Sequence, residues 1–236
     1  LGYSFMTGRQ VSQMIIERIP KTLELALSSL ILALALSIPL GVLSAVKENS
    51  IFDRLVTTFS VVANSMPPFW VGINMIIIFG IILGWLPTSG AGMGKGLTEH
   101  LRSLILPMVV LGLSRMGMIT RLIRNSLLEV LHEDYIVTAR AKGLQEYIVI
   151  YKHALRNALL PVVTILGLQL AFILSGSVLV ETVFAWPGMG RFFVISANRR
   201  DYTTLMGFSL LISFMIIFAM LIIDITYALL DPRIKY

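Results

Sequence analysis

The stretch DYIVTARAKGLQEYIVIYKHALRNALLP occupies Asp134–Pro161 and is the longest polar-rich stretch in a chain that is otherwise mostly apolar. It contains a run of small and basic residues, ARAKG, at Ala139–Gly143. Long apolar runs flank it on both sides. Its basic residues are Arg140, Lys142, Lys152 and Arg156. The pattern predicts an ordered polar segment between two membrane-spanning helices.

The composition assigns the chain to the integral membrane proteins. Of its 236 residues, 56% are hydrophobic and 14% are charged, and the mean hydropathy is +0.85. Soluble domains are about 45–50% apolar and about 25% charged. The net charge of +6 does not indicate nucleic acid as a partner, because no basic stripe alternates with exposed aromatic residues. It favours cytoplasmic basic loops that lie near anionic lipid.

The hydropathy pattern predicts an all-α, polytopic helical bundle with five visible spans. Residues 1–21 precede them, and Val11, Met14, Ile15 and Ile19 in that segment recur at the spacing of a short interfacial helix. Residues 22–236 then form the membrane domain. Because the chain starts at Leu1, we expect one upstream span to be missing. The expected spans are residues 22–46, 55–85, 104–128, 157–184 and 203–230.

Two features within the spans are candidates for a transport pathway or gate. Pro67 and Pro68, followed by Phe69, interrupt the second span and must kink or break its helix. Such a break faces other helices or a cavity, because its freed carbonyls need partners; a mere packing kink is equally compatible with the pattern. Arg115 lies deep in the third span, where it is either a functional charge or part of a helix–helix seam. Arg121 and Arg124 are expected to reach the cytoplasmic interface.

The distribution of Lys and Arg predicts the orientation of the chain. Residues 115–156 contain seven basic residues and are expected to lie inside. Residues 1–21, 86–103 and 185–202 then lie outside, and the C-terminal tail lies inside. The segment 129–156 is therefore predicted to be a cytoplasmic loop.

No enzyme constellation is present in the sequence. The Gly-Lys pair in residues 86–103 lacks the flanking Gly and Ser/Thr of a phosphate-binding loop. There is no cysteine, and the three histidines (His100, His132 and His153) fall in different loops, so we expect no metal site. Glu181 and Asp224 near span ends are expected to be interfacial residues that bond to a neighbouring helix or to water.

Several segments together resemble the ABC-importer permeases of the dipeptide, oligopeptide and nickel family. Val137, Thr138 and Ala139 stand where that family has its cytoplasmic Glu-Ala-Ala motif, and Gly143 is its glycine. Ala139 matches the second alanine, whereas Val137 and Thr138 depart from the motif. The other matching segments are ARAKG (139–143) as a whole, HALRNALLP (153–161), ETVFAWPGMGR (181–191), RDY (200–202), DPRIKY (231–236), residues 20–41 and residues 68–70.

The resemblance implies a set of partners and sites. The chain would pair with a second, homologous permease in the inner (cytoplasmic) membrane of a bacterium or archaeon. Two cytoplasmic ATPases would bind ATP and Mg²⁺, with no cofactor in this chain, and an external solute-binding protein would deliver the substrate. The residues expected to couple to the ATPases are Ala139, Arg140, Ala141, Lys142, Gly143 and Glu146. They fit a short coupling helix that Gly143 ends in a left-handed turn. The external loop expected to contact the binding protein or to cap the pathway contains Trp186, Pro187, Gly188, Gly190 and Arg191.

Peptides are the substrate expected for this subgroup, moved by alternating access. Nickel or another metal chelate, glutathione and sugars remain open, because the binding protein usually selects the substrate. Two other classes also remain open. One is a secondary transporter or channel without ATPases, against which the lack of an inverted repeat argues; the other is a membrane scaffold that transports nothing.

Overall fold

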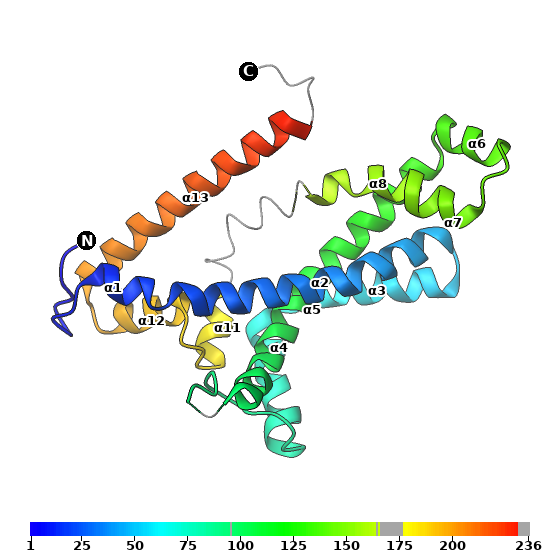
Figure 1. The fold of residues 1–236 in the computed structure, drawn as a ribbon. Coiled ribbons are helices and arrows are strands. Elements are labelled where there is room, and N and C mark those ends of the chain that lie inside the picture. Colours follow the sequence, from blue (N-terminus) through cyan, green and yellow to red (C-terminus); the bar gives the residue numbers. More distant parts are fainter. Residues whose placement is uncertain (95, 164, 166–176, 231–236) are drawn as a thin grey trace. The chain divides into compact units, whose positions relative to one another are not determined.

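Helices form the architecture of the chain (Figure 1). The computed structural model describes residues 1–94, 96–163, 165 and 177–230. Within these residues there is no strand, only an isolated bridge between Tyr3 and Gln10, so the all-α prediction is confirmed. The elements are α1 (Val11–Ile16), α2 (Ile19–Val46), α3 (Ile51–Ser65), α4 (Pro68–Met75), η1 (Ile76–Ile82), α5 (Leu97–Leu131), α6 (Asp134–Ala141), α7 (Glu146–Ile148), η2 (Val149–Ala154), α8 (Leu155–Ala158), α11 (Val178–Val183), α12 (Met189–Asn198) and α13 (Tyr202–Leu230).

Two helical segments among the described residues are long and apolar enough to cross a membrane. They are the run Val11–Val46, which contains α2, and α5. The broken pair of α3 with α4 and η1 makes a third if it counts as one span, and Tyr202–Phe218 of α13 is a shorter apolar helix. The first and third expected spans are thereby confirmed as helices. Residues 164 and 166–176 of the fourth expected span, 157–184, lie outside the described residues.

The break predicted at the double proline is present. Helix α3 ends at Ser65, and Pro67 and Pro68 begin α4 as its N-cap and first residue. A proline is tolerated at this position because the first N–H groups of a helix have no intrahelical partner. The role of Pro67, Pro68 and Phe69 in a gate stays a prediction.

The chain divides into two compact units. Unit 1 consists of Leu1–Ser29, Pro67–Leu111 and Gly167–Tyr236, and unit 2 consists of Leu30–Met66 and Gly112–Leu166. Helices α2 and α5 each contribute to both units. The two units are described separately below.

Unit 2 has one continuous apolar core. Side chains of α2, α5, α6, η2 and α8 meet in it, and Ile119, Ile123 and Leu127 of α5 are fully buried. Close helix contacts accompany this packing. A Cβ on Gly41 of α2 would lie 2.8 Å from the Ile123 side chain, and one on Gly117 of α5 would lie 2.3 Å from the Ser60 carbonyl oxygen. Small residues permit this approach of helix backbones.

A partly buried ion pair joins the helices of unit 2 beside this core. Arg124 of α5 donates two hydrogen bonds to Asp53 of α3, at 2.6 and 2.7 Å. Ser44 of α2 donates to the same carboxylate at 2.5 Å, and the Asn49 N–H donates at 3.0 Å. Asp53 is buried, and the Arg124 side chain is 20% exposed. The Arg124 guanidinium is thus held by Asp53, and its position at the cytoplasmic interface stays a prediction.

The described residues of unit 1 form two apolar clusters. In one, Val11, Met14 and Ile15 of α1 pack with residues of α12 and α13, among them Phe192 and Phe208. The short helix expected near the N-terminus is thus present, but its apolar face is covered by protein. In the other cluster, Trp186 and Phe184 pack with residues of α2, α4, η1, α5 and α11.

Candidate functional site

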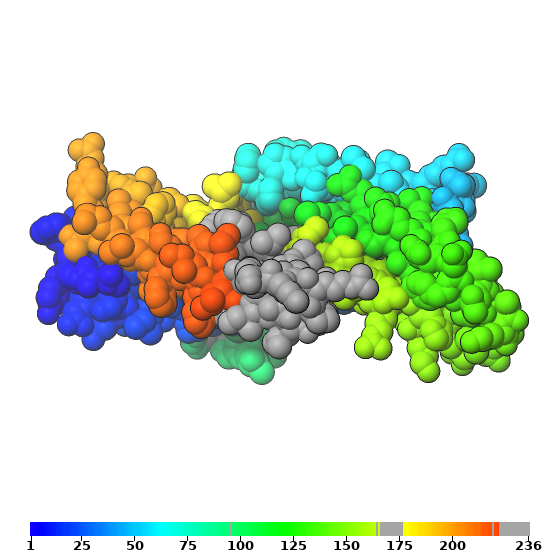
Figure 2. All heavy atoms as spheres, turned by 90° about the horizontal axis from the view of Figure 1, so that it is seen from above, coloured from blue at the N-terminus to red at the C-terminus, as the bar shows by residue number. Residues whose placement is uncertain are grey.

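Helix α6 is a short helix with one face anchored in unit 2. Ile136 and Ala139, three residues apart and therefore on one face, are buried in the unit 2 core. The remaining residues of the helix are exposed, and the space-filling view shows the green segment that contains α6 at the surface (Figure 2). Helix α6 is thus exposed on one side and packs on its other side against the same core as α2 and α5.

Gly143 terminates this segment in the left-handed conformation that the sequence predicted. Its φ is +76°, and its N–H donates to the Arg140 carbonyl oxygen at 2.9 Å. A Cβ on Gly143 would meet no atom within 4 Å, so the glycine is required by backbone geometry and not by space.

The exposed basic residue of α6 has a partner within the chain. Arg140 donates from Nη2 to Oε1 of Glu146 at 2.7 Å and from Nε to Oε2 at 3.2 Å. The hydrogen bond from Arg140 lowers the pKa of the Glu146 carboxyl, and the same bond raises the pKa of the Arg140 guanidinium. Both side chains remain about half exposed. The sequence placed Arg140 and Glu146 in the same site but did not predict that they pair.

A hollow of about 240 Å³ lies beside α6 in unit 2. It has an apolar part and a charged part that includes the Arg140–Glu146 pair. Its lining residues are Ala45, Val46, Glu48, Leu128, Leu131, His132, Arg140, Glu146 and Ile150. This space is large enough to receive side chains of another protein.

The six predicted coupling residues differ in exposure. Arg140, Ala141, Lys142, Gly143 and Glu146 are exposed, whereas Ala139 is 8% exposed and packs inside unit 2. A direct contact of Ala139 with a partner is therefore not available in this structure. Its small side chain instead allows α6 to lie close to its own core.

The predicted external loop is largely internal to unit 1. Trp186 is fully buried, and its indole Nε1 donates to the Lys21 carbonyl oxygen at 2.8 Å. Gly188 and Gly190 are also buried, while Pro187 and Arg191 are partly exposed. The Arg191 guanidinium donates to the Ala185 carbonyl oxygen at 2.8 Å. Contact of this loop with a binding protein stays a prediction, for which Pro187 and Arg191 are the accessible residues.

A buried carboxylate explains the shape of this loop. Glu181 of α11 accepts hydrogen bonds from the Thr22 and Ser177 hydroxyls, both at 2.8 Å, and from the Arg191 N–H at 3.1 Å. Glu181 is fully buried in the protein. Its expected bond to a neighbouring helix is confirmed by Thr22 of α2, and its position at the membrane interface stays a prediction. The sequence signal for this packing was Gly188 and Gly190, since a Cβ at either position would meet Glu181.

We expect Gly188→Ala to destabilise unit 1. A Cβ on Gly188 would lie 2.4 to 2.6 Å from the Glu181 carboxylate atoms, which is overpacking with a cost of about 1–3 kcal/mol. The measurement is thermal unfolding of the purified protein. Glu181→Asp shortens the opposing side chain and should recover part of the loss in the double variant. Equal losses in the single and double variants would contradict this packing.

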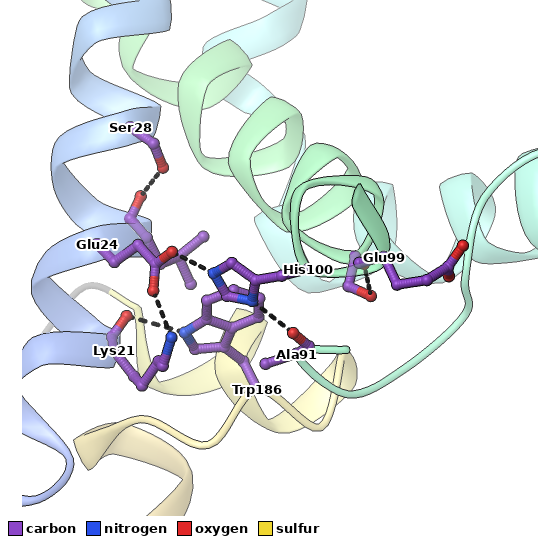
Figure 3. Close-up of polar contacts among 9 residues, drawn as sticks. Lys21, Glu24, Ser28, Ala91, Glu99, His100 and Trp186 are labelled. Atoms are coloured by element: carbon purple, nitrogen blue, oxygen red, sulfur yellow. Dashed lines mark hydrogen bonds and ion pairs between the residues drawn. The ribbon is translucent and has the colours of Figure 1, made fainter. Parts of the chain in front are cut away.

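A polar cluster in unit 1 joins α2, α5 and two loops (Figure 3). His100 in the first turn of α5 contacts Oε1 of Glu24 through Nε2, and its Nδ1 lies 2.5 Å from the Ala91 carbonyl oxygen. Lys21 donates to Oε2 of Glu24 at 2.9 Å. The Trp186 ring lies beside the imidazole, with ring centroids 5.7 Å apart. Sequence reasoning did not find this cluster, because 76 residues separate His100 from Glu24.

Comparison with solved structures agrees with the helical architecture. The structure is similar to the MetNI methionine ABC transporter in an inward-facing conformation, with a TM-score of 0.73, 20% identity, and coverage of 93% of this chain and 97% of that chain. It is also similar to an amino acid ABC transporter, with a TM-score of 0.65, 13% identity, and coverage of 96% and 98%. At such identities the likeness shows a shared fold.

Sequence relatives define the family. Residues 37–236 match the model of the binding-protein-dependent transport system inner membrane component. The oligopeptide permease AppB of Bacillus subtilis is 45% identical over 97% of this chain and 73% of its own length. The dipeptide permease DppB of Escherichia coli is 40% identical over the whole chain and 77% of its own length. The chain belongs to the family of binding-protein-dependent transport inner membrane components and is a multi-pass inner-membrane permease.

Proposed function

We propose that this permease imports peptides, driven by cytoplasmic ATPases that dock on α6. The relatives AppB and DppB are named as oligopeptide and dipeptide permeases, and this likeness supports peptides over nickel, metal chelates, glutathione or sugars. The observation that carries the docking proposal is α6 itself, a presented helix anchored by Ile136 and Ala139 and ended by Gly143.

The proposed docking surface combines an apolar patch with the hollow beside α6. Val137 is 57% exposed, Leu144 is 38% exposed and Tyr147 is 62% exposed. Exposed apolar groups of this kind mark contact sites for proteins or lipid. The hollow would receive side chains of the ATPase. In this proposal residues 129–156 face the cytoplasm, as the basic residues of the segment favour.

Force would pass from the ATPase to the membrane helices through the unit 2 core. Ile136 and Ala139 belong to the same apolar cluster as Val42 of α2 and Ile123 of α5. Packed cores resist continuous deformation, so a displacement of α6 would carry the adjoining ends of α2 and α5 with it. ATP binding would move α6 in this way and open the pathway outward, and hydrolysis would reset it. ATP and Mg²⁺ would be bound by the ATPases, and the complete importer would contain two ATPases, a second homologous permease and an external binding protein.

Reconstitution tests this proposal. We expect two ATPase subunits and a second permease to co-purify with this chain, and peptide uptake into proteoliposomes to require ATP and the binding protein. Competition between a labelled peptide and Ni²⁺ chelates or glutathione distinguishes the substrates. Uptake driven by an ion gradient without ATPases would favour a secondary transporter, and the absence of any uptake would favour a scaffold.

A further inference from the structure

Both ring nitrogens of His100 face oxygen atoms that accept hydrogen bonds. Nδ1 faces the Ala91 carbonyl oxygen, and Nε2 faces Oε1 of Glu24 (Figure 3). A carbonyl oxygen and an ionised carboxylate have no proton to donate, and a neutral imidazole carries only one N–H. The two contacts are therefore both hydrogen bonds only when the His100–Glu24 pair holds one additional proton.

We propose that His100 and Glu24 form a proton-dependent latch that holds the loop around Ala91 and the Trp186 loop against α2. In the latched state the imidazole is an imidazolium ion and the carboxyl is a carboxylate. The Lys21 ammonium, 2.9 Å from Oε2 of Glu24, stabilises the carboxylate and so favours the extra proton on His100. Loss of that proton leaves a lone pair of the ring facing either Glu24 or Ala91, and one of the two contacts opens.

The charged groups near the imidazole are Lys21 and Glu24 of α2 and Glu99 and Arg102 of α5. Glu99 and Arg102 pair with each other at 3.0 Å, and Arg102 also donates to the Trp85 carbonyl oxygen at 2.8 Å. Glu24 is therefore the carboxylate that His100 contacts. The loop after α11 contributes the uncharged Trp186 ring, and Arg191 of α12 is bound to the Ala185 carbonyl oxygen. The His100 side chain is 16% exposed and that of Glu24 is 31% exposed, so protons reach the pair from solvent.

The latch would control a junction of four segments of unit 1. The Ala91 loop is held to the Trp186 loop by the Gly90 N–H, which donates to the Phe184 carbonyl oxygen at 2.8 Å. Trp186 in turn donates to the Lys21 carbonyl oxygen of α2. The junction is therefore closed while the pair holds its additional proton and loosens when that proton is lost as the pH rises. Its location on the external side rests on the orientation used in the proposed function, whereas the proton chemistry does not.

Hydrogen exchange of the purified importer in lipid nanodiscs tests the latch without any transport assay. The readout is the protection of peptides covering residues 86–94, corrected for the chemical exchange rate, at about pH 5.5 and pH 8.5. In the native protein we expect protection to fall about tenfold or more at the higher pH, because a charge-assisted hydrogen bond is lost. A native protein with equal protection at both pH values would overturn the proposal.

Three variants separate the latch from simple packing. Glu24→Gln provides an amide that can donate to the neutral His100 ring. Residues 86–94 should therefore stay protected at both pH values. The glutamine side chain in His100→Gln reaches only one of the two acceptors. Residues 86–94 should therefore be less protected at both pH values, and their protection should not change with pH. His153→Gln, in η2 of unit 2, is the matched control and should keep the native step. If the step persists in Glu24→Gln, the pair is not its origin, even where His100→Gln fails to fold.

Discussion

Peptide uptake is expected to fall by about tenfold or more in Ala141→Trp, with little change in the thermal stability of the permease. Ala141 is exposed at the end of α6, so a large side chain there does not disturb the unit 2 core. The tryptophan side chain does enter the space that the proposed ATPase contact requires. Overpacking of a contact costs about 1–3 kcal/mol, and about 1.4 kcal/mol corresponds to a tenfold change in affinity. The measurements are ATP-dependent uptake, ATPase co-purification and thermal unfolding.

Two variants of neighbouring alanines complete this experiment. Ala141→Ser keeps a small side chain and should transport as the native protein does. Ala139 lies inside unit 2, so Ala139→Trp should unfold the permease. Ala139 is therefore unsuited to test docking. Native uptake and native ATPase binding in Ala141→Trp would show that α6 is not the docking helix.

Removal of the Asp53 carboxylate is expected to give the largest loss of stability. In Asp53→Ala the Arg124 guanidinium, 20% exposed, loses both of its hydrogen bonds to Asp53. Breaking a buried pair by removing one partner costs about 3–5 kcal/mol, because the other charge stays uncompensated. The expected result is a marked decrease in the melting temperature of the purified importer.

The double-mutant cycle for Asp53 and Arg124 distinguishes the pair from independent effects. Arg124→Ala alone leaves the Asp53 carboxylate with the Ser44 hydroxyl and the Asn49 N–H as donors. The double variant Asp53→Ala/Arg124→Ala should lose less stability than the sum of the two single losses, by about 0.5–3 kcal/mol. Strict additivity would mean that the pair does not join α3 to α5.

Local chemistry explains the features that the sequence predicted correctly. The helix break at Pro67 and Pro68 follows from two missing N–H groups, and the left-handed turn at Gly143 follows from the absence of a Cβ. Hydrophobic length was enough to locate α2 and α5. Each of these properties belongs to a few neighbouring residues, so no tertiary information was needed.

Long-range partners explain what the sequence did not reveal. Asp53 and Arg124 are 71 positions apart, and Thr22 and Glu181 are 159 apart. A hydropathy pattern identifies charged residues near span ends but does not identify the groups that bind them. The burial of Ala139 and Trp186 has the same origin, because it depends on which faces of distant helices meet. Exposure of the predicted site residues could therefore be decided only from the fold.

The Arg140–Glu146 pair has a consequence for the way a partner would approach α6. An exposed ion pair is worth about 0–1 kcal/mol, so exchanging Glu146 for an acidic group of another protein would cost little. Until that exchange, the two-pronged bond keeps the guanidinium of Arg140 in one orientation, and fewer rotamers remain to be frozen on association. In the proposed complex the pair would therefore preorganise Arg140 to bind a carboxylate of the partner.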